Sequence, residues 1–268
     1  MLAVFSSGDA SKEAQQKINS SLASIKNSLT FYRLVREGSE FGLFPEGVTN
    51  FDGMLLRAAH SLGKGSLLVV HDDEKEGEAR SAIRLFALGE ESETFGSHTF
   101  IFPARFSTMG RVHIAPIAEK KMVAVGASTE PTIYLLDTEN VSCLAKLTLT
   151  EQLVTFCASP LKPYLFLVTE PTTTATFPPQ TVALLACDEP KKAKIVMSDE
   201  CIDGKDSVSF AVWAPSNEIL MKKDSGLYGV AASVLMAKKG KKSDLMRKNS
   251  SHKNLAEKLR GSFSKLFN

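Results

Sequence analysis

The segment from Val154 to Val168 reads VTFCASPLKPYLFLV. It begins with residues that alternate in polarity, continues through a turn rich in Pro, Ser and Lys, and ends in a continuous apolar run. Alternation with a period of two is typical of a half-buried strand, and a short apolar run bounded by turn residues is typical of a buried one. The segment therefore predicts a strand-turn-strand unit.

The same pattern occurs three more times, as LLRAAHSLGKGSLLVV from Leu55, VHIAPIAEKKMVAVG from Val112 and VSFAVWAPSNEILM from Val208. The four units start 57, 42 and 54 residues apart. Two of them continue into further apolar runs, at 82–88 and at 132–137 with 141–147, which gives four strands per unit. Four strands in a period of this length are typical of propeller blades. We expect a mainly β protein, with a sandwich or another two-sheet domain as the alternative.

The patterns Val-x-Phe-x-x-x-Pro, Leu-x-Val and Ile-Tyr-Leu-Leu-Asp-Thr in these units resemble the WD40-like β-propeller family over residues 50–235. The resemblance implies antiparallel blades and a protein-binding scaffold. Asp137 is the nearest match to the family's Trp-Asp pair, and no Gly-His pair stands at the expected places. Because residues 30–239 hold only four or five blades, we expect a partial or open propeller, completed by another chain or covered by an N-terminal helix.

The N-terminal segment places Ile18, Leu22, Ile25 and Leu29 at steps of four, three and four. This spacing predicts an amphipathic helix that docks on the body, in preference to a coiled coil. The predicted organisation is an N-terminal helix over 1–29, a β-propeller-like domain over 30–237 and a basic tail over 238–268.

The sequence carries no motif typical of catalysis or metal binding. Gly63-Lys-Gly-Ser66 lacks the spacing of a phosphate loop and predicts a hairpin turn. His60 and Ser61 are adjacent, so they point to opposite faces of a strand and do not suit a dyad. The acidic run over 72–78 after His71 lacks the spacing of a calcium loop and predicts a solvated loop tip. Trp213 is expected to pack in the core. We predict no catalytic residue, cofactor or metal.

The composition is that of a globular protein, with 43% hydrophobic and 23% charged residues. The four cysteines, Cys143, Cys157, Cys187 and Cys201, contain no Cys-x-x-Cys pair and suit reduced, partly buried thiols. Residues 1–5 are too short and too uncharged for a signal peptide. We expect a cytoplasmic protein.

The charge is strongly divided along the chain. Residues 238–268 hold ten Lys or Arg and two acidic residues, a net charge of +8, while the other 237 residues carry −6. After a lysine-rich linker, Asn254 and Glu257 suit the start of a helix with one apolar face. Such a helix suits an anionic membrane surface or the groove of a calmodulin-like partner, and suits nucleic acid less well. A frayed, solubilising terminus is the alternative.

The residues expected to bind the membrane or partner are basic or lie on that apolar face. They are Lys238, Lys239, Lys241, Lys242, Arg247, Lys248, Leu255, Leu259, Arg260, Phe263, Leu266 and Phe267. Ser250, Ser262 and Ser264 are candidates for phosphorylation, which would cancel much of the positive charge. The run over 259–265, LRGSFSK, is similar to the phosphorylated basic segment of the lethal giant larvae family, whose members are propeller scaffolds of cell polarity and exocytosis.

These patterns lead to a functional hypothesis. We expect a non-catalytic scaffold that binds a protein partner through its β-repeats and docks reversibly, at the periphery of a membrane or in a partner groove, through its tail. A structural subunit whose propeller is completed by a larger complex is the main alternative, and a propeller-type enzyme is the third.

Overall fold

The computed structural model describes residues 2–6, 27–51, 56–63, 66–75, 78–87, 98–173, 176, 178–202 and 204–233. Within these ranges the chain is mainly β, with eighteen strands and two short 3-10 helices, Pro190–Lys192 and Gly204–Asp206. Among the described residues no helix has the length and hydropathy that crossing a membrane requires. The predicted fold class is thus confirmed at the level of a mainly β protein.

The strands form five antiparallel sheets, and in each sheet neighbouring strands are consecutive in the chain. The first and last sheets have three strands: β1 (Leu2–Ser6), β2 (Asn27–Glu37) and β3 (Glu40–Phe51), and then β16 (Val208–Trp213), β17 (Glu218–Lys223) and β18 (Gly226–Ala231).

The three sheets between them have four strands each and are blade-like. They consist of β4 (Leu56–Gly63), β5 (Ser66–Lys75), β6 (Glu78–Ala87) and β7 (His98–Ile101), then β8 (Val112–Ile117), β9 (Met122–Ala127), β10 (Thr132–Asp137) and β11 (Cys143–Thr148), and then β12 (Gln152–Ala158), β13 (Tyr164–Glu170), β14 (Gln180–Ala186) and β15 (Lys194–Ile202). The four strand-turn-strand units expected from the sequence are confirmed as β4–β5, β8–β9, β12–β13 and β16–β17.

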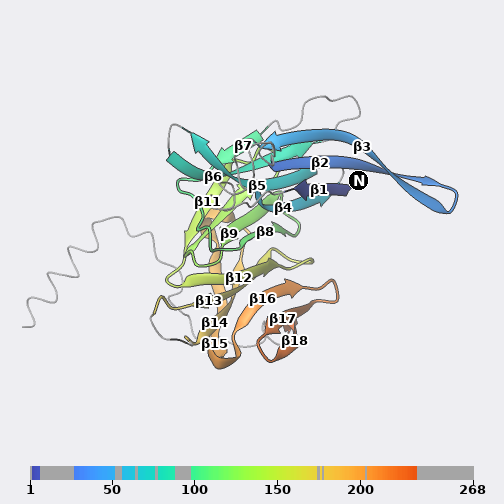
Figure 1. Ribbon diagram of the computed structural model, residues 1–268. Helices are drawn as coiled ribbons and strands as arrows, with labels where there is room; N and C mark the ends of the chain where they lie inside the picture. The colour runs from blue at the N-terminus through green and yellow to red at the C-terminus, as the bar shows by residue number, and fades with distance from the viewer. Residues whose placement is uncertain are drawn as a thin grey trace, which may run out of the picture.

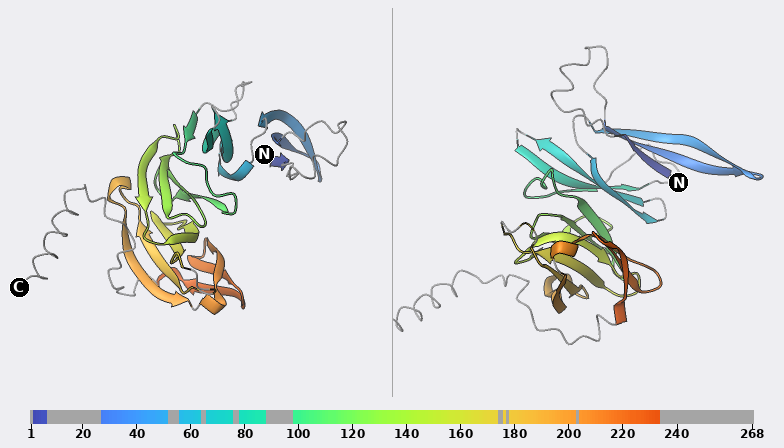
Figure 2. Two further views of the ribbon diagram at one scale, coloured as in Figure 1. Left: turned by 60° about the vertical axis from the view of Figure 1, so that its left-hand side comes forward. Right: turned by 60° about the horizontal axis from the view of Figure 1, so that its bottom comes forward.

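The sheets follow one another in chain order along a curved arc, from β1–β3 at one end to β16–β18 at the other (Figures 1 and 2). The first strands of successive sheets lie side by side, because β8 contacts both β4 and β12, and β12 contacts β16. Among the described strands, these four therefore line the concave side of the arc.

Apolar side chains from facing sheets fill the spaces between them. In β13, Leu165 and Leu167 pack toward the sheet that precedes it, whereas Phe166 and Val168 pack toward the last sheet, and all four are completely buried. A third cluster joins sheets β4–β7 and β8–β11. Because a central sheet is covered on both faces, its inner strands need apolar residues at consecutive positions, which explains the continuous runs in the sequence.

Strands β4 and β5 pair as a hairpin, as the sequence predicts. Gly63 pairs with Ser66 across the two strands. Gly63 has a φ of +79°, a left-handed conformation that glycine adopts without a steric penalty. The predicted hairpin is therefore confirmed.

The N-terminal segment differs from the expected helix at both of its ends. Leu2–Ser6 forms β1, and Asn27–Glu37 forms β2, which pairs with it. Leu29 ends the helical spacing in the sequence but also fits the alternation Leu29-Thr-Phe31, and strand pairing uses the second pattern. The rest of the predicted helix, residues 7–26, lies outside the described residues.

The start of the acidic run after His71 is not the solvated loop tip that the sequence predicts, whereas residues 76–77 of the run lie outside the described residues. Strand β5 continues through it to Lys75, and Asp72 is buried at 6% exposure. The Asp72 carboxylate accepts hydrogen bonds from Arg105 Nε at 2.9 Å and Nη2 at 2.6 Å, and Arg57 Nη1 lies 3.6 Å away. Because two guanidinium groups neutralise it, this carboxylate is accommodated in the interior.

Candidate functional site

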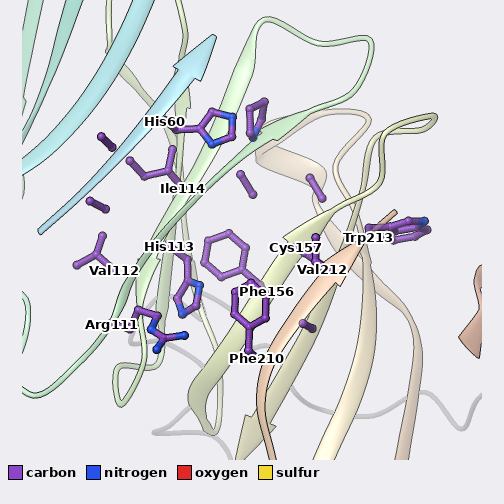
Figure 3. Close-up of a pocket in the computed structure, with 16 residues that line it drawn as sticks. His60, Arg111, Val112, His113, Ile114, Phe156, Cys157, Phe210, Val212 and Trp213 are labelled. Atoms are coloured by element: carbon purple, nitrogen blue, oxygen red, sulfur yellow. The ribbon is translucent and has the colours of Figure 1, made fainter. Parts of the chain in front are cut away.

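A pocket of about 420 Å³ opens on the concave side of the arc (Figure 3). Its walls come from the four first strands: residues 58–60 of β4, 112–116 of β8 together with Arg111, 156–158 of β12 and 210–213 of β16. The pocket is thus formed where four sheets meet, and most of its lining is apolar. None of its lining residues is acidic.

Arg111 and Phe210 stand together at one end of the pocket. The Arg111 guanidinium carbon lies 5.9 Å from the centre of the Phe210 ring, within the range of a cation–π contact. The backbone of Arg111 is held by Ser128, whose hydroxyl accepts from Arg111 N at 2.7 Å and whose N–H donates to Arg111 O at 2.9 Å. Phe210 remains 41% exposed. The site thus offers a positioned cation beside an exposed aromatic ring.

His113 lies on β8, two residues after Arg111, which directly precedes this strand. Its ring centre is 5.5 Å from that of Phe156, and in Figure 3 the two rings converge near Phe210. The buried Nε2 atom has no hydrogen-bond partner among the described residues. Burial, with a smaller contribution from the charge of Arg111, lowers the pKa of His113 to about 4. The imidazole is therefore neutral at pH 7.

His60 lines the pocket from β4, and burial lowers its pKa as well. Its neighbour Ser61 is turned away, with a hydroxyl that accepts from Gly63 N at 3.2 Å. The separation of these two side chains agrees with the expectation from strand geometry. His60 thus contributes a polar group to the pocket without a serine partner.

Trp213 packs in the core, as expected from the sequence. It belongs to the cluster between the last two sheets and is 5% exposed, while its Nε1 donates to Asn217 Oδ1 at 3.0 Å. Cys157 and Cys187 are also buried, and burial raises the pKa of each thiol to about 12. These thiols are accordingly uncharged, unreactive components of the core.

The outer face of the last sheet is a second candidate surface. We use this name for the face formed by two rows across β16, β17 and β18, which are Phe210–Lys222–Leu227 and Val212–Leu220–Gly229. Leu227 is 70% exposed and Val212 is 42% exposed. The opposite face, which includes Ala211, Met221, Trp213 and Ile219, is buried against β12–β15. The last sheet therefore buries one apolar face and exposes the other.

The binding and phosphorylation residues predicted from the sequence all belong to 238–268 and lie outside the described residues. Sequence reasoning did not identify the pocket, although a signal was present. Phe156 and Phe210 occupy the same, third position when the units from Val154 and Val208 are aligned. Equivalent positions on neighbouring first strands lie close together in a stack of sheets, so the alignment could have suggested a shared site.

Groups of three or more His, Cys, Asp or Glu side chains suited to a metal ion do not occur among the described residues. The pocket instead combines a cation, neutral imidazoles and aromatic faces, which suits reversible, noncovalent binding. The sequence matches no protein-family model and no curated protein.

Proposed function

We propose that this protein is a non-catalytic interaction scaffold, an open WD40-like β-propeller that binds a protein partner through its β-repeat body. The observation that supports this most directly is the outer face of the last sheet. Leu227, Val212 and Phe210 are all more than 40% exposed there, on neighbouring rows of one sheet. Contiguous exposed apolar residues of this kind commonly mark protein-binding surfaces.

The central sheets indicate what this face would bind. In those sheets both faces are covered by a neighbouring sheet, whereas the outer face carries the same kind of residues without a covering sheet among the described residues. Within the part of the chain that the structure describes, the last sheet also has three strands where the central ones have four. Strand β18 is thus an edge that an additional strand could pair with.

The partner we propose is a different protein with an apolar sheet face and an extended strand for the edge of β18. Lys222 stands in the middle of the Phe210–Lys222–Leu227 row and is exposed. A carboxylate at the corresponding place on the partner would complement this charge and favour one orientation. This reading includes the case in which the chain is a subunit of a larger complex that completes its propeller.

Photo-crosslinking tests the proposal. The photoreactive residue p-benzoylphenylalanine is placed at Leu227, or at Leu161 as a control, since Leu161 is 53% exposed in the turn after β12. The full-length protein is irradiated in an extract of its own cells. We expect a discrete heteromeric adduct at position 227 and none at 161. Equal labelling at both positions, or an adduct with a second copy of this chain, would contradict the proposal.

The captured protein must then bind the purified chain. Leu227→Lys places a charge on the outer face at a residue that does not line the concave pocket, and it should weaken binding at least tenfold, because complex formation would desolvate an unpaired ammonium group at an apolar interface. Val196→Lys is the matched control, since Val196 is 45% exposed on β15, in a different sheet. Equal affinities of the two variants would overturn the assignment of this face.

The second part of the proposal concerns the basic segment over 238–268. We propose that this segment docks reversibly on an anionic membrane or in a partner groove, and that the protein is cytoplasmic and peripheral at a membrane. Its +8 charge joined to a −6 body supports this proposal. Co-sedimentation with vesicles that contain 30% phosphatidylserine should fall strongly when the chain ends before Lys238. Equal co-sedimentation of the full-length and shortened chains would remove the membrane from the proposal.

A further inference from the structure

We propose that the concave pocket is a binding site for a carboxylate carried on an aromatic or apolar group. The acid is expected to bind between Arg111 and His113, with its apolar part against Phe156 and Phe210. The pocket shares Phe210 and Val212 with the outer face of the last sheet, but the inference rests on Arg111 and His113 and is tested with the purified chain alone.

Arg111 supplies the charge that a carboxylate needs. No acidic side chain forms an ion pair with Arg111 among the described residues, and none lines the pocket. A guanidinium group presents two parallel N–H donors that match the two oxygens of a carboxylate. The contact with Phe210 and the two backbone hydrogen bonds to Ser128 restrict the position of Arg111 before a ligand arrives.

His113 supplies a second polar group at the same end of the pocket. Its Nε2 is buried without a hydrogen-bond partner among the described residues, and a buried polar atom in this state destabilises a protein. A ligand oxygen that accepts a hydrogen bond from Nε2–H would remove this penalty. Because Arg111 and His113 stand two positions apart in the chain and both line the pocket, a single carboxylate can interact with both.

The aromatic rings select what the carboxylate is attached to. Phe156 lies 5.5 Å from His113, measured between ring centres, and the ring of Phe210 lies beside Arg111. With small residues such as Ala58, Ala115 and Ala158 along the other walls, the space between the rings suits a flat or branched apolar group. A phosphate is less well matched, because phosphate sites usually combine several cations or backbone donors.

Ligand-observed NMR on the purified full-length chain tests this inference, with 3-phenylpropionate as the acid and 3-phenylpropionamide as its uncharged isostere. We expect the acid to bind and the amide to bind about tenfold more weakly, as loss of a charge-assisted hydrogen bond predicts. Arg111→Gln should weaken binding of the acid by a similar factor. Lys120→Gln, at an exposed position in the β8–β9 turn, is the control and should leave it unchanged. Equal binding of acid and amide, or by wild type and Arg111→Gln, would overturn the inference.

The wild-type protein provides a second measurement that requires no variant to fold. The side-chain nitrogen resonances of His113 should shift on titration with 3-phenylpropionate and not with the amide. Unchanged resonances at saturating acid would refute a contact with Nε2.

The capped peptide acetyl-Ser-Phe-Glu-Phe-Ser-amide distinguishes two sources of the same carboxylate chemistry. Tighter binding of the peptide than of 3-phenylpropionate supports an acidic segment of a partner protein. Binding of the free acid alone supports a small-molecule acid. Binding of neither probe rejects the site, whatever the cross-linking result at Leu227.

Discussion

The side-chain amide of Gln180 forms hydrogen bonds with both backbone polar groups of Val208. Val208 N donates to Gln180 Oε1 at 2.7 Å, and Gln180 Nε2 donates to Val208 O at 3.3 Å. Gln180 begins β14 and Val208 begins β16, and the two residues are 2% and 1% exposed. The buried amide of Gln180 thus supplies the hydrogen-bond partners that a neighbouring strand would otherwise give to Val208. It also attaches the last sheet to the one before it.

Gln180→Leu should therefore destabilise the protein more than a typical substitution of an exposed residue does. The substitution keeps a similar volume but leaves the N–H and C=O of Val208 buried without partners, which we expect to lower the free energy of unfolding by about 3 kcal/mol. Urea unfolding followed by circular dichroism measures this loss. The control is Gln152→Leu, because the amide of half-buried Gln152 makes no hydrogen bond within the described residues. Similar losses for the two variants would show that the pairing with Val208 contributes little.

Asp72→Asn should lower the free energy of unfolding more than Gln180→Leu does. It removes the charge that neutralises Arg105 and the almost fully buried Arg57, whose side chain is 5% exposed. Breaking a buried ion pair by neutralising one partner typically costs about 3–5 kcal/mol. The thermal midpoint and the urea midpoint should both fall. Glu139→Gln, which breaks the exposed Lys121–Glu139 pair, should change the free energy of unfolding by less than about 1 kcal/mol, and a comparable effect of the two variants would contradict this account.

The strand-turn-strand units could be predicted because their pattern is local. A strand covered on both faces needs consecutive apolar residues, and Leu165 to Val168 display that requirement within four positions. The burial of Asp72 could not be predicted in this way. Arg57 stands on the paired strand β4, but Arg105 stands 33 residues away from Asp72 and meets it only after the segment that follows β7 has packed. Out of that context, four consecutive polar residues resemble a loop.

The pocket could not be predicted from the sequence, because it too depends on residues that only packing brings together. His113, Phe156 and Phe210 belong to three different sheets, and each alone is an unremarkable strand residue. Their convergence depends on the curvature of the arc, which brings first strands together on the concave side (Figures 2 and 3). Alignment of the repeats identifies which strand positions are equivalent, but the curvature that makes them neighbours is a property of sheet packing.

Gly110→Ala should be destabilising for steric reasons. A Cβ atom at Gly110 would overlap the backbone oxygen of Ser128, so the two segments would have to separate. We expect the free energy of unfolding to fall by more than about 2 kcal/mol, measured by urea unfolding. Gly63→Ala is the comparison: its Cβ would meet no atom within 4 Å, and only the positive φ opposes it, at about 1 kcal/mol. A larger effect at Gly63 than at Gly110 would contradict the steric account.

The protonation of His113 should make stability depend on pH in a defined window. Its pKa is about 4 in the folded protein and 6.5 in the absence of burial, so the unfolded chain binds the proton more tightly. Stability from this group is complete above pH 6.5, decreases as the pH falls toward 4 and then levels off, with a total change of about 3 kcal/mol. At pH 5.5 about 1.4 kcal/mol should already be lost.

Comparison of the wild type with His113→Asn isolates this contribution. The carboxylates and His60, whose pKa burial also lowers, titrate in both proteins and cancel in the difference of their unfolding free energies. Urea unfolding at pH 7.5, 6.5, 5.5 and 4.5 should show that the wild type loses stability more steeply than the variant as the pH falls. Parallel pH profiles would mean that His113 is readily protonated in the folded protein. In that case Nε2 would already be in contact with solvent rather than buried beside Phe156.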